Sequence, residues 1–303
     1  MFSFAHVSDL HATPPQLRGP MELLNKRGLG WLSWQLRRRR IHRPEIVECL
    51  IEDLHAQRPD HVVLTGDLTQ IGLASEVEAA RIWLERLGPA AHVTAIPGNH
   101  DAYVSAPWQE RWEPWADYMV SDGVEPTSLS FPSVRRRGPV ALVGVSSALP
   151  TGPLRASGCV GTPQLQRLET QLVELGRARV CRVVLIHHPP VAGVASPRRA
   201  LDDAEALQAV LVRAGAELVL HGHTHRSLVG ELPGPQRPIP VVGVCSASEV
   251  GSKPGKRSQY HLIEVEERVT AKGDIHFSLA LRSRAYRPDG SGFDPLGEVH
   301  ALS

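Results

Sequence analysis

Short apolar runs alternate along the chain with longer segments whose apolar positions recur every three or four residues. The runs at 62–64 and 183–186 are apolar throughout, a pattern typical of strands buried on both faces of a sheet. The segment that begins at Pro44 has helical spacing instead, with proline in its first turn and one apolar side. This alternation predicts an α/β fold.

The same pattern predicts the remaining elements. Further strands are expected at 2–8, 92–96, near 127–132, 140–146 and 217–220, and further helices after Ser75 (with Glu78 at capping-box spacing), from Thr162 and at 203–213. Residues 228–281 are mostly strand-like with glycine and proline turns, which favours a second sheet packed on the first. We therefore predict a four-layer α/β/β/α sandwich, organised as a single domain over 1–281 with a loop-rich surface tail over 282–303.

Composition excludes several classes of protein. The formal net charge is +1, so there is no overall bias toward nucleic acid, and no nucleic-acid partner is expected. The four cysteines form no Cys-x-x-Cys pair, which argues against a disulfide framework or a zinc knuckle. Because the sequence shows neither a secretory signal pattern nor an apolar stretch of ~18 to 20 residues, we expect a cytoplasmic protein, with peripheral contact to the inner membrane left open.

Polar blocks rich in histidine and aspartate follow five of the predicted strands. They are Asp9-Leu10-His11, Gly66-Asp67, Gly98-Asn99-His100-Asp101, His187-His188-Pro189-Pro190 and Gly222-His223-Thr224-His225. Functional loops of open α/β sheets collect at the carboxyl ends of the strands, so we expect the blocks to share one site. Three oxygen donors and four imidazoles are too many for one tetrahedral ion and suit two metals that share a carboxylate. Mixed nitrogen and oxygen ligation favours Mn, Fe, Zn or Co over Mg or Ca.

This set of blocks, in this order, resembles the motifs of the calcineurin-like (binuclear) metallophosphoesterases. The residues within the blocks are most similar to those of the class III cyclic nucleotide phosphodiesterases. The resemblance implies the same four-layer fold and in-line attack of a metal-bridged hydroxide on phosphorus. It assigns Asp9, His11, Asp67 and His225 to the first metal. Asp67 would bridge to the second metal, which also takes Asn99, His187 and His223. His100 matches the family's non-ligand histidine, which approaches the phosphate, and we expect Asp101 to orient His100.

The residues within the blocks also narrow the range of expected substrates. Protein serine/threonine phosphatases carry Gly-Asp-x-Val-Asp-Arg-Gly, whereas this chain has Gly-Asp-Leu-Thr-Gln-Ile-Gly at 66–72, without the arginine. A phosphoprotein substrate is therefore disfavoured, and a 3′,5′-cyclic nucleotide or similar small phosphodiester is expected. A nuclease is less favoured because no extended basic face is evident, and a non-catalytic scaffold because every expected ligand is present.

Residues 18–43 allow two interpretations. The segment mixes tryptophan and leucine with the basic run Arg37-Arg38-Arg39-Arg40, a pattern typical of helices that lie on an anionic membrane surface. Equally, it could pack its apolar side on the domain and expose its arginines. The first interpretation suits a nucleotide-linked lipid, and it resembles in character the metallophosphoesterases that cleave the pyrophosphate of UDP-diacylglucosamine in lipid A synthesis. Isolated histidines such as His42 and His61 are interpreted as solvated or structural.

Overall fold

The computed structural model describes residues 1–251, 254–269, 273 and 275–302. Its centre is a pair of six-stranded sheets. The first sheet has the order β12-β11-β10-β1-β2-β3, formed by Phe293–Ala301, Ile275–Tyr286, Gln259–Val269, Phe2–Val7, His61–Leu64 and Val93–Ala95. The second has the order β4-β5-β6-β7-β9-β8, formed by Ser133–Arg137, Val140–Gly144, Cys181–Leu185, Leu218–His221, Ile239–Gly243 and Leu228–Leu232.

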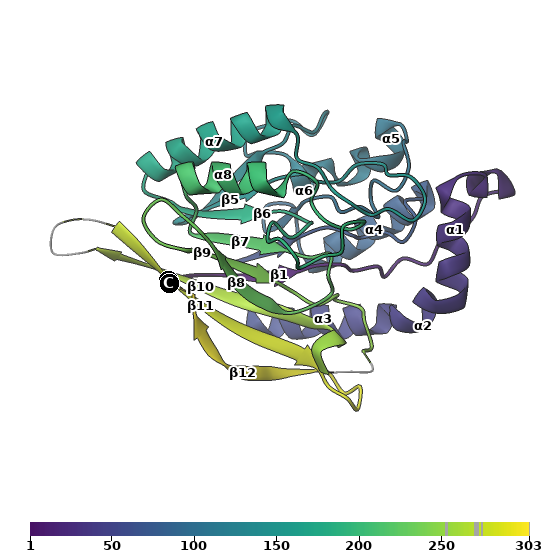
Figure 1. Cartoon of the computed structure of the whole chain (residues 1–303). Helices are drawn as coiled ribbons and strands as arrows, with labels where there is room; N and C mark the ends of the chain where they lie inside the picture. The colour runs from purple at the N-terminus through teal and green to yellow at the C-terminus, as the bar shows by residue number, and fades with distance from the viewer. Residues whose placement is uncertain (252–253, 270–272, 274, 303) are drawn as a thin grey trace.

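Helices cover the outer face of each sheet. Helices α3 (Pro44–Gln57) and α4 (Ala74–Leu87) pack on the first sheet, and α7 (Thr162–Arg177) and α8 (Ala204–Ala214) on the second. Figure 1 shows α7 and α8 above the strands of the second sheet. Between the sheets lie fully buried apolar side chains from both, among them Phe4, Val63, Leu142 and Val183. Burying each such side chain stabilises the folded state by about 1.5 to 3 kcal/mol. The apolar strands therefore hold the two sheets together. The predicted α/β/β/α sandwich is confirmed.

Both sheets contain a parallel block. In the first sheet β1, β2 and β3 run parallel, and in the second β5, β6, β7 and β9 do. The five polar blocks directly follow β1, β2, β3, β6 and β7 at their carboxyl ends. The strand pattern therefore places all five at one edge of the sandwich.

Two local predictions need correction. The strand expected near 127–132 begins instead at Ser133. The capping residue expected at Ser75 is also wrong, because its hydroxyl donates to the carbonyl of Gln16. The start of α4 is held by Glu76, whose carboxylate accepts the backbone N–H groups of Gln70, Ile71 and Leu73.

The prediction of a loop-rich tail over 282–303 is wrong. Strand β11 runs across position 282 without interruption, and β12 follows as the edge strand of the first sheet. Pro295 and Gly297 and the largely exposed side chains of β12 give it the composition of a loop. Such residues are tolerated on an edge strand, where half of the backbone needs no partner.

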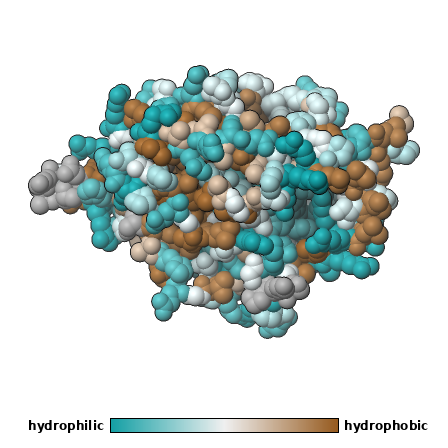
Figure 2. Space-filling view, viewed as in Figure 1, coloured by the Kyte–Doolittle hydropathy of each residue, from teal (hydrophilic) through white to brown (hydrophobic). Residues whose placement is uncertain are grey.

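Residues 18–43 form an arm beside the site edge of the sandwich. It comprises η1 (Pro20–Leu23), α1 (Lys26–Ser33), η2 (Trp34–Arg38) and α2 (Arg39–Ile41), and Figure 1 shows it in purple at one end of the molecule. Trp31 packs on Ile71, Leu73 and Tyr103, whereas leucines face outward. Figure 2 shows hydrophobic residues along this end. Among the described residues, no helix combines the length and apolarity needed to cross a bilayer.

The arm matches neither interpretation in full. Its inner face holds Arg27, Trp31, Trp34 and Arg38, which are half-buried, together with the buried Gly30. Its outer face exposes apolar residues, namely Met21, Leu24, Leu29, Leu32 and Leu36. The arm thus packs on the domain through tryptophan and arginine and leaves leucine in solvent.

Candidate metal centre

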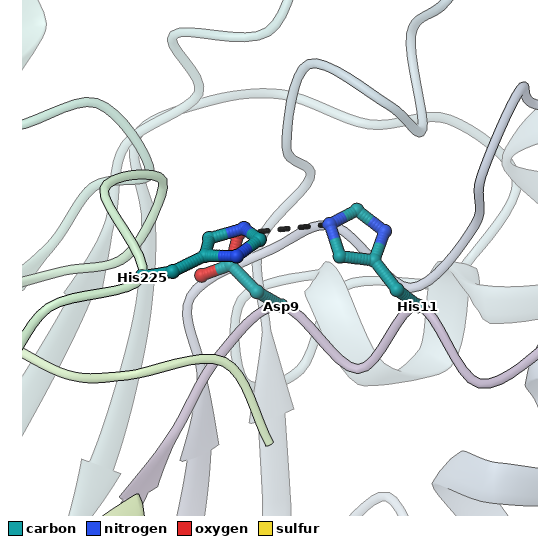
Figure 3. A group of neighbouring side chains, drawn as sticks. All are labelled: Asp9, His11 and His225. Carbon is teal, nitrogen blue, oxygen red and sulfur yellow. Dashed lines mark ion pairs between the residues drawn. The ribbon is translucent and has the colours of Figure 1, made fainter. Parts of the chain in front are cut away.

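One cluster forms around the carboxylate of Asp9. Asp9 and His11 lie on the loop after β1, and His225 reaches the same point from the loop after β7 (Figure 3). Asp9 Oδ1 lies 3.2 Å from Nε2 of His225 and 3.9 Å from Nε2 of His11. This oxygen is buried and accepts no hydrogen bond from the described residues. A buried carboxylate oxygen is costly unless a cation, either a protonated imidazole or a metal ion, lies beside it.

A second cluster forms around Asp67. Its Oδ2 lies 3.2 Å from Nε2 of His187 and 3.6 Å from Nε2 of His11, so one carboxylate oxygen faces histidines of both clusters. Asn99 Oδ1 lies 3.1 Å from Nε2 of His187, and candidate ligand atoms of Asp67, His187 and His223 lie within 4.8 Å of one another. The structure thus brings the seven residues predicted as ligands close together, and Asp67 Oδ2 lies near imidazoles of both clusters.

The backbone is strained where these side chains are attached. Five of the eight non-glycine residues with positive φ among those described are Asp9, His11, Asp67, His223 and His225, with φ between 41° and 66°. A side chain in this region costs of order 1 to 3 kcal/mol and persists only where surrounding structure enforces it. The concentration of strain at predicted ligands supports a functional centre.

Two glycines allow the loops to approach the carboxylates. A Cβ atom on Gly98 would lie 2.2 Å from Oδ1 of Asp67, and one on Gly222 would lie 1.9 Å from Oγ of Ser8 and 2.6 Å from Oδ2 of Asp9. Either would clash with the groups that form the clusters. Glycine is required at both positions by close approach.

Hydrogen bonds orient the imidazoles. Nδ1–H of His11 donates to the carbonyl of Thr69 and Nδ1–H of His187 to that of Thr65, both at 2.7 Å. Each bond leaves Nε2 with its lone pair directed at the cluster, as a metal ligand requires. In His223 the roles of the two ring nitrogens are reversed. Nε2 contacts the carbonyl of Arg199 at 2.9 Å, and Nδ1 remains available as a metal ligand.

Charges in the two clusters are coupled. Burial lowers the pKa of His187, but the carboxylate of Asp67 outweighs this effect and raises it to about 9. Burial likewise opposes the effect of Asp9 on His225, whose pKa is also raised to about 9. Each buried carboxylate is thus neutralised by a cationic imidazole. A metal ion can supply this positive charge instead once the imidazole loses its proton. The donor set fits two divalent cations.

His100 lies beside the clusters as expected, but Asp101 does not orient it. Candidate ligand atoms of His11, Asp67 and His100 lie within 4.8 Å of one another. The Nδ1–H group of His100 donates to the backbone carbonyl of Gln70. The carboxylate of Asp101 instead accepts backbone N–H groups of both ligand loops, those of Asp67, Leu68, Thr69 and Gly98. The prediction that Asp101 orients His100 is therefore wrong, because the loop amides occupy the carboxylate.

Sequence reasoning missed two residues at the centre. Glu249 Oε2 lies 3.2 Å from Nδ1 of His225 and orients that ring. His42, interpreted above as solvated or structural, is buried, with its ring centroid 4.7 Å from that of His11 and 5.5 Å from that of His225. Neither stands in a motif, and no spacing in the sequence links them to the site.

Comparison with known proteins agrees with this geometry. Residues 2–227 match the family of calcineurin-like phosphoesterases. The chain belongs to this family. The donor set of the two clusters is the one expected of a metal-dependent phosphoesterase of this family with two divalent ions.

Individual relatives are distant. The chain is 29% identical over 180 residues to a probable cyclic nucleotide phosphodiesterase of Synechococcus sp., an alignment that covers 58% of this chain and 62% of the relative. A dimetal phosphatase from Danio rerio has a similar fold (TM-score 0.58, 13% identity, 100% of this chain and 99% of the other). So does the purple acid phosphatase PPD1 from yellow lupin, Lupinus luteus (TM-score 0.59, 14% identity, 97% and 53%).

Proposed function

We propose that the protein is a phosphodiesterase that hydrolyses 3′,5′-cyclic nucleotides or similar small phosphodiesters. The observation that carries this proposal is the pair of carboxylate–imidazole clusters joined through Asp67 Oδ2, with His100 beside them. The name of the Synechococcus relative, a probable cyclic nucleotide phosphodiesterase, and the sequence motifs of the five blocks favour a cyclic diester. Mn, Fe, Zn or Co would suit the mixed ligands.

Each side chain has a defined task in this proposal. Asp9, His11, Asp67 and His225 would hold one ion, and Asp67, Asn99, His187 and His223 the other. When bound, the two ions supply charge for the phosphoryl oxygens and lower the pKa of water. The carbonyls of Thr65 and Thr69 and the carboxylate of Glu249 keep the ligand rings turned inward.

His100 would act on the substrate directly. Because Nδ1–H is bound to the carbonyl of Gln70, Nε2 is the nitrogen left to face the phosphate. From there it can hold a proton for the leaving oxygen or stabilise the charge that develops on phosphoryl oxygens.

Hydrolysis by the purified, Mn-loaded protein tests the proposal. The substrates are bis-p-nitrophenyl phosphate, cAMP, cGMP and UDP-diacylglucosamine. Metal content is measured in parallel for wild type, Asp67→Ala and Asn99→Ala. We expect up to two ions per chain, less metal in both variants, and no turnover by them. Well-folded wild type that never exceeds background metal after reloading would refute the binuclear centre.

One observation favours a second candidate, a membrane-associated pyrophosphatase acting on a nucleotide-linked lipid such as UDP-diacylglucosamine. The outer face of the arm exposes Leu29, Leu32 and Leu36 by 54%, 50% and 68% next to the site edge. A cyclic nucleotide gives no reason for an apolar surface there, whereas a lipid-linked phosphate does. Turnover of UDP-diacylglucosamine in preference to cAMP would select this candidate.

A further inference from the structure

The arm turns one arginine of its basic run toward the candidate metal centre. Arg37, Arg39 and Arg40 are exposed, but Arg38 is half-buried. Its Nη1 donates to the carbonyl of Gln70 at 3.2 Å and lies 3.3 Å from Nδ1 of His100. Arg38 thus lies beside the ring of His100, and a ligand atom of that ring is within 4.8 Å of those of His11 and Asp67.

The packing of the arm fixes this arginine in place. Gly30 lies so close to Tyr103 that an added Cβ would stand 2.5 Å from the phenol oxygen. Arg27 donates to the carbonyls of Ile71 and Gly72. At the far end of the arm, the backbone N–H of Arg43 donates to the carbonyl of Ser248 at 2.9 Å. Because the arm is held on both sides of Arg38, the guanidinium is positioned before any substrate arrives.

The charge of Arg38 has no acidic counterpart among the residues that the structure describes. Two other half-buried arginines pair with carboxylates: Arg182 lies 2.8 Å from Glu217, and Arg284 lies 2.6 Å from Asp53. The half-buried Arg27 has no carboxylate partner among the described residues, but two backbone carbonyls bind its guanidinium. Within the described part of the chain, Arg38 forms no ion pair, and its hydrogen-bond partners are uncharged or themselves basic. A half-buried guanidinium without a carboxylate beside a phosphate-hydrolysing centre is suited to bind an anion from solution.

We propose that Arg38 binds a non-bridging oxygen of the substrate phosphate next to His100, so that the arm forms part of the active site. This inference rests on the proposed function only in placing a phosphate at the metal centre. The ligand is a tetrahedral oxyanion, of which inorganic phosphate is the simplest example. A guanidinium–oxyanion contact would also explain why only one residue of the basic run is turned inward.

Binding of inorganic phosphate to the Mn-loaded protein, measured by titration calorimetry, tests the inference. Arg38→Met removes the charge but keeps an unbranched stem for packing, and Arg37→Met is the matched control on the exposed neighbour. We expect phosphate to bind ~10- to 100-fold more weakly to the Arg38 variant, the usual range for a lost charge-assisted hydrogen bond. Arg37→Met should match wild type, and Arg38→Lys should lie between.

Each outcome decides the question. Unchanged phosphate affinity in Arg38→Met overturns the inference. Equal weakening in Arg37→Met also overturns it, since that would indicate a general electrostatic effect of the basic run. Circular dichroism and metal analysis establish that each variant is folded and loaded. If Arg38→Met does not fold, Arg38→Lys against Arg37→Lys applies the same criteria. Wild type that binds phosphate through Arg38 but hydrolyses no diester would refute the proposed function and leave the inference standing.

Discussion

Asp101 accepts a hydrogen bond from the backbone N–H of Asp67 at 2.9 Å, across the two loops that carry the central ligands. The same carboxylate accepts the N–H of Gly98, also at 2.9 Å. Asp101 thus ties together the loop of the shared carboxylate and the loop of Asn99. We infer from these bonds that Asp101 holds the ligand loops in position.

Asp101→Ala should therefore destabilise the protein and empty the metal centre. The substitution leaves four backbone N–H groups without their acceptor, and we expect a loss of about 3 kcal/mol or more in unfolding free energy. Denaturant unfolding and metal analysis measure the two effects. Normal stability and metal content with slow turnover would instead restore a role for Asp101 through His100.

His100→Ala should have the opposite profile. Because His100 stands outside the proposed ligand sets, metal content should be retained, while the rate falls by ~10² to 10⁴. The loss should be smaller for p-nitrophenyl esters than for alkyl esters, since a good leaving group needs no proton. Steady-state rates on both substrate types provide the measurement. Equal losses would leave charge stabilisation as the only role of His100.

Glu249→Gln should weaken metal binding without unfolding the protein. Glu249 contacts the ring nitrogen of His225 that faces away from Asp9. Loss of such an outer carboxylate typically costs ~10- to 100-fold in metal affinity. Competition with a chelator gives the affinity, and unfolding curves serve as the control. Affinity equal to wild type would show that His225 needs no support from Glu249.

The contrast between these residues shows what sequence can predict here. Asp9, Asp67 and His187 follow apolar strands, so the strand pattern alone predicts that they converge. Glu249 and His42 reach the centre because two segments that are distant in the sequence meet there. The contact is an isolated antiparallel bridge between these two residues. No local pattern encodes such a contact. The sandwich was predictable for the same reason as the ligands, whereas β12 and the tryptophan-inward arm depend on neighbours that the sequence does not reveal.

Stability should fall on mild acidification, in part through His61. Burial, reinforced by Arg137, lowers the pKa of His61 to about 3, and its ring bonds Thr94 at 2.8 Å. The unfolded chain binds this proton near pH 6.5 and the folded chain does not, so stability is lost as pH decreases below 6.5. One such group costs about 2 kcal/mol by pH 5. Urea unfolding at pH 7 and pH 5 should show a smaller decrease for His61→Gln than for wild type, and an identical decrease would contradict the assignment.

The outer face of the arm should bind anionic membranes. Leu29, Leu32 and Leu36 are exposed on one side, and Arg37, Arg39 and Arg40 follow directly. Each arginine near an anionic surface contributes ~1 kcal/mol, so sedimentation with phosphatidylserine vesicles should greatly exceed that with phosphatidylcholine vesicles and decrease with salt. Because Trp31 packs on the domain, leucine rather than tryptophan should insert, and tryptophan emission should change little.

A triple substitution of Leu29, Leu32 and Leu36 by serine separates this surface from the active site. It should abolish sedimentation with anionic vesicles and leave hydrolysis of bis-p-nitrophenyl phosphate unchanged, because these side chains point away from the metal centre. Leu296→Ser, which changes an exposed leucine on β12, is the matched control and should sediment like wild type. If the triple variant still sediments, the arginines act alone and the apolar face has another partner. If wild type does not sediment at low salt, the main support for a lipid-linked substrate is removed, and the small phosphodiester remains the better candidate.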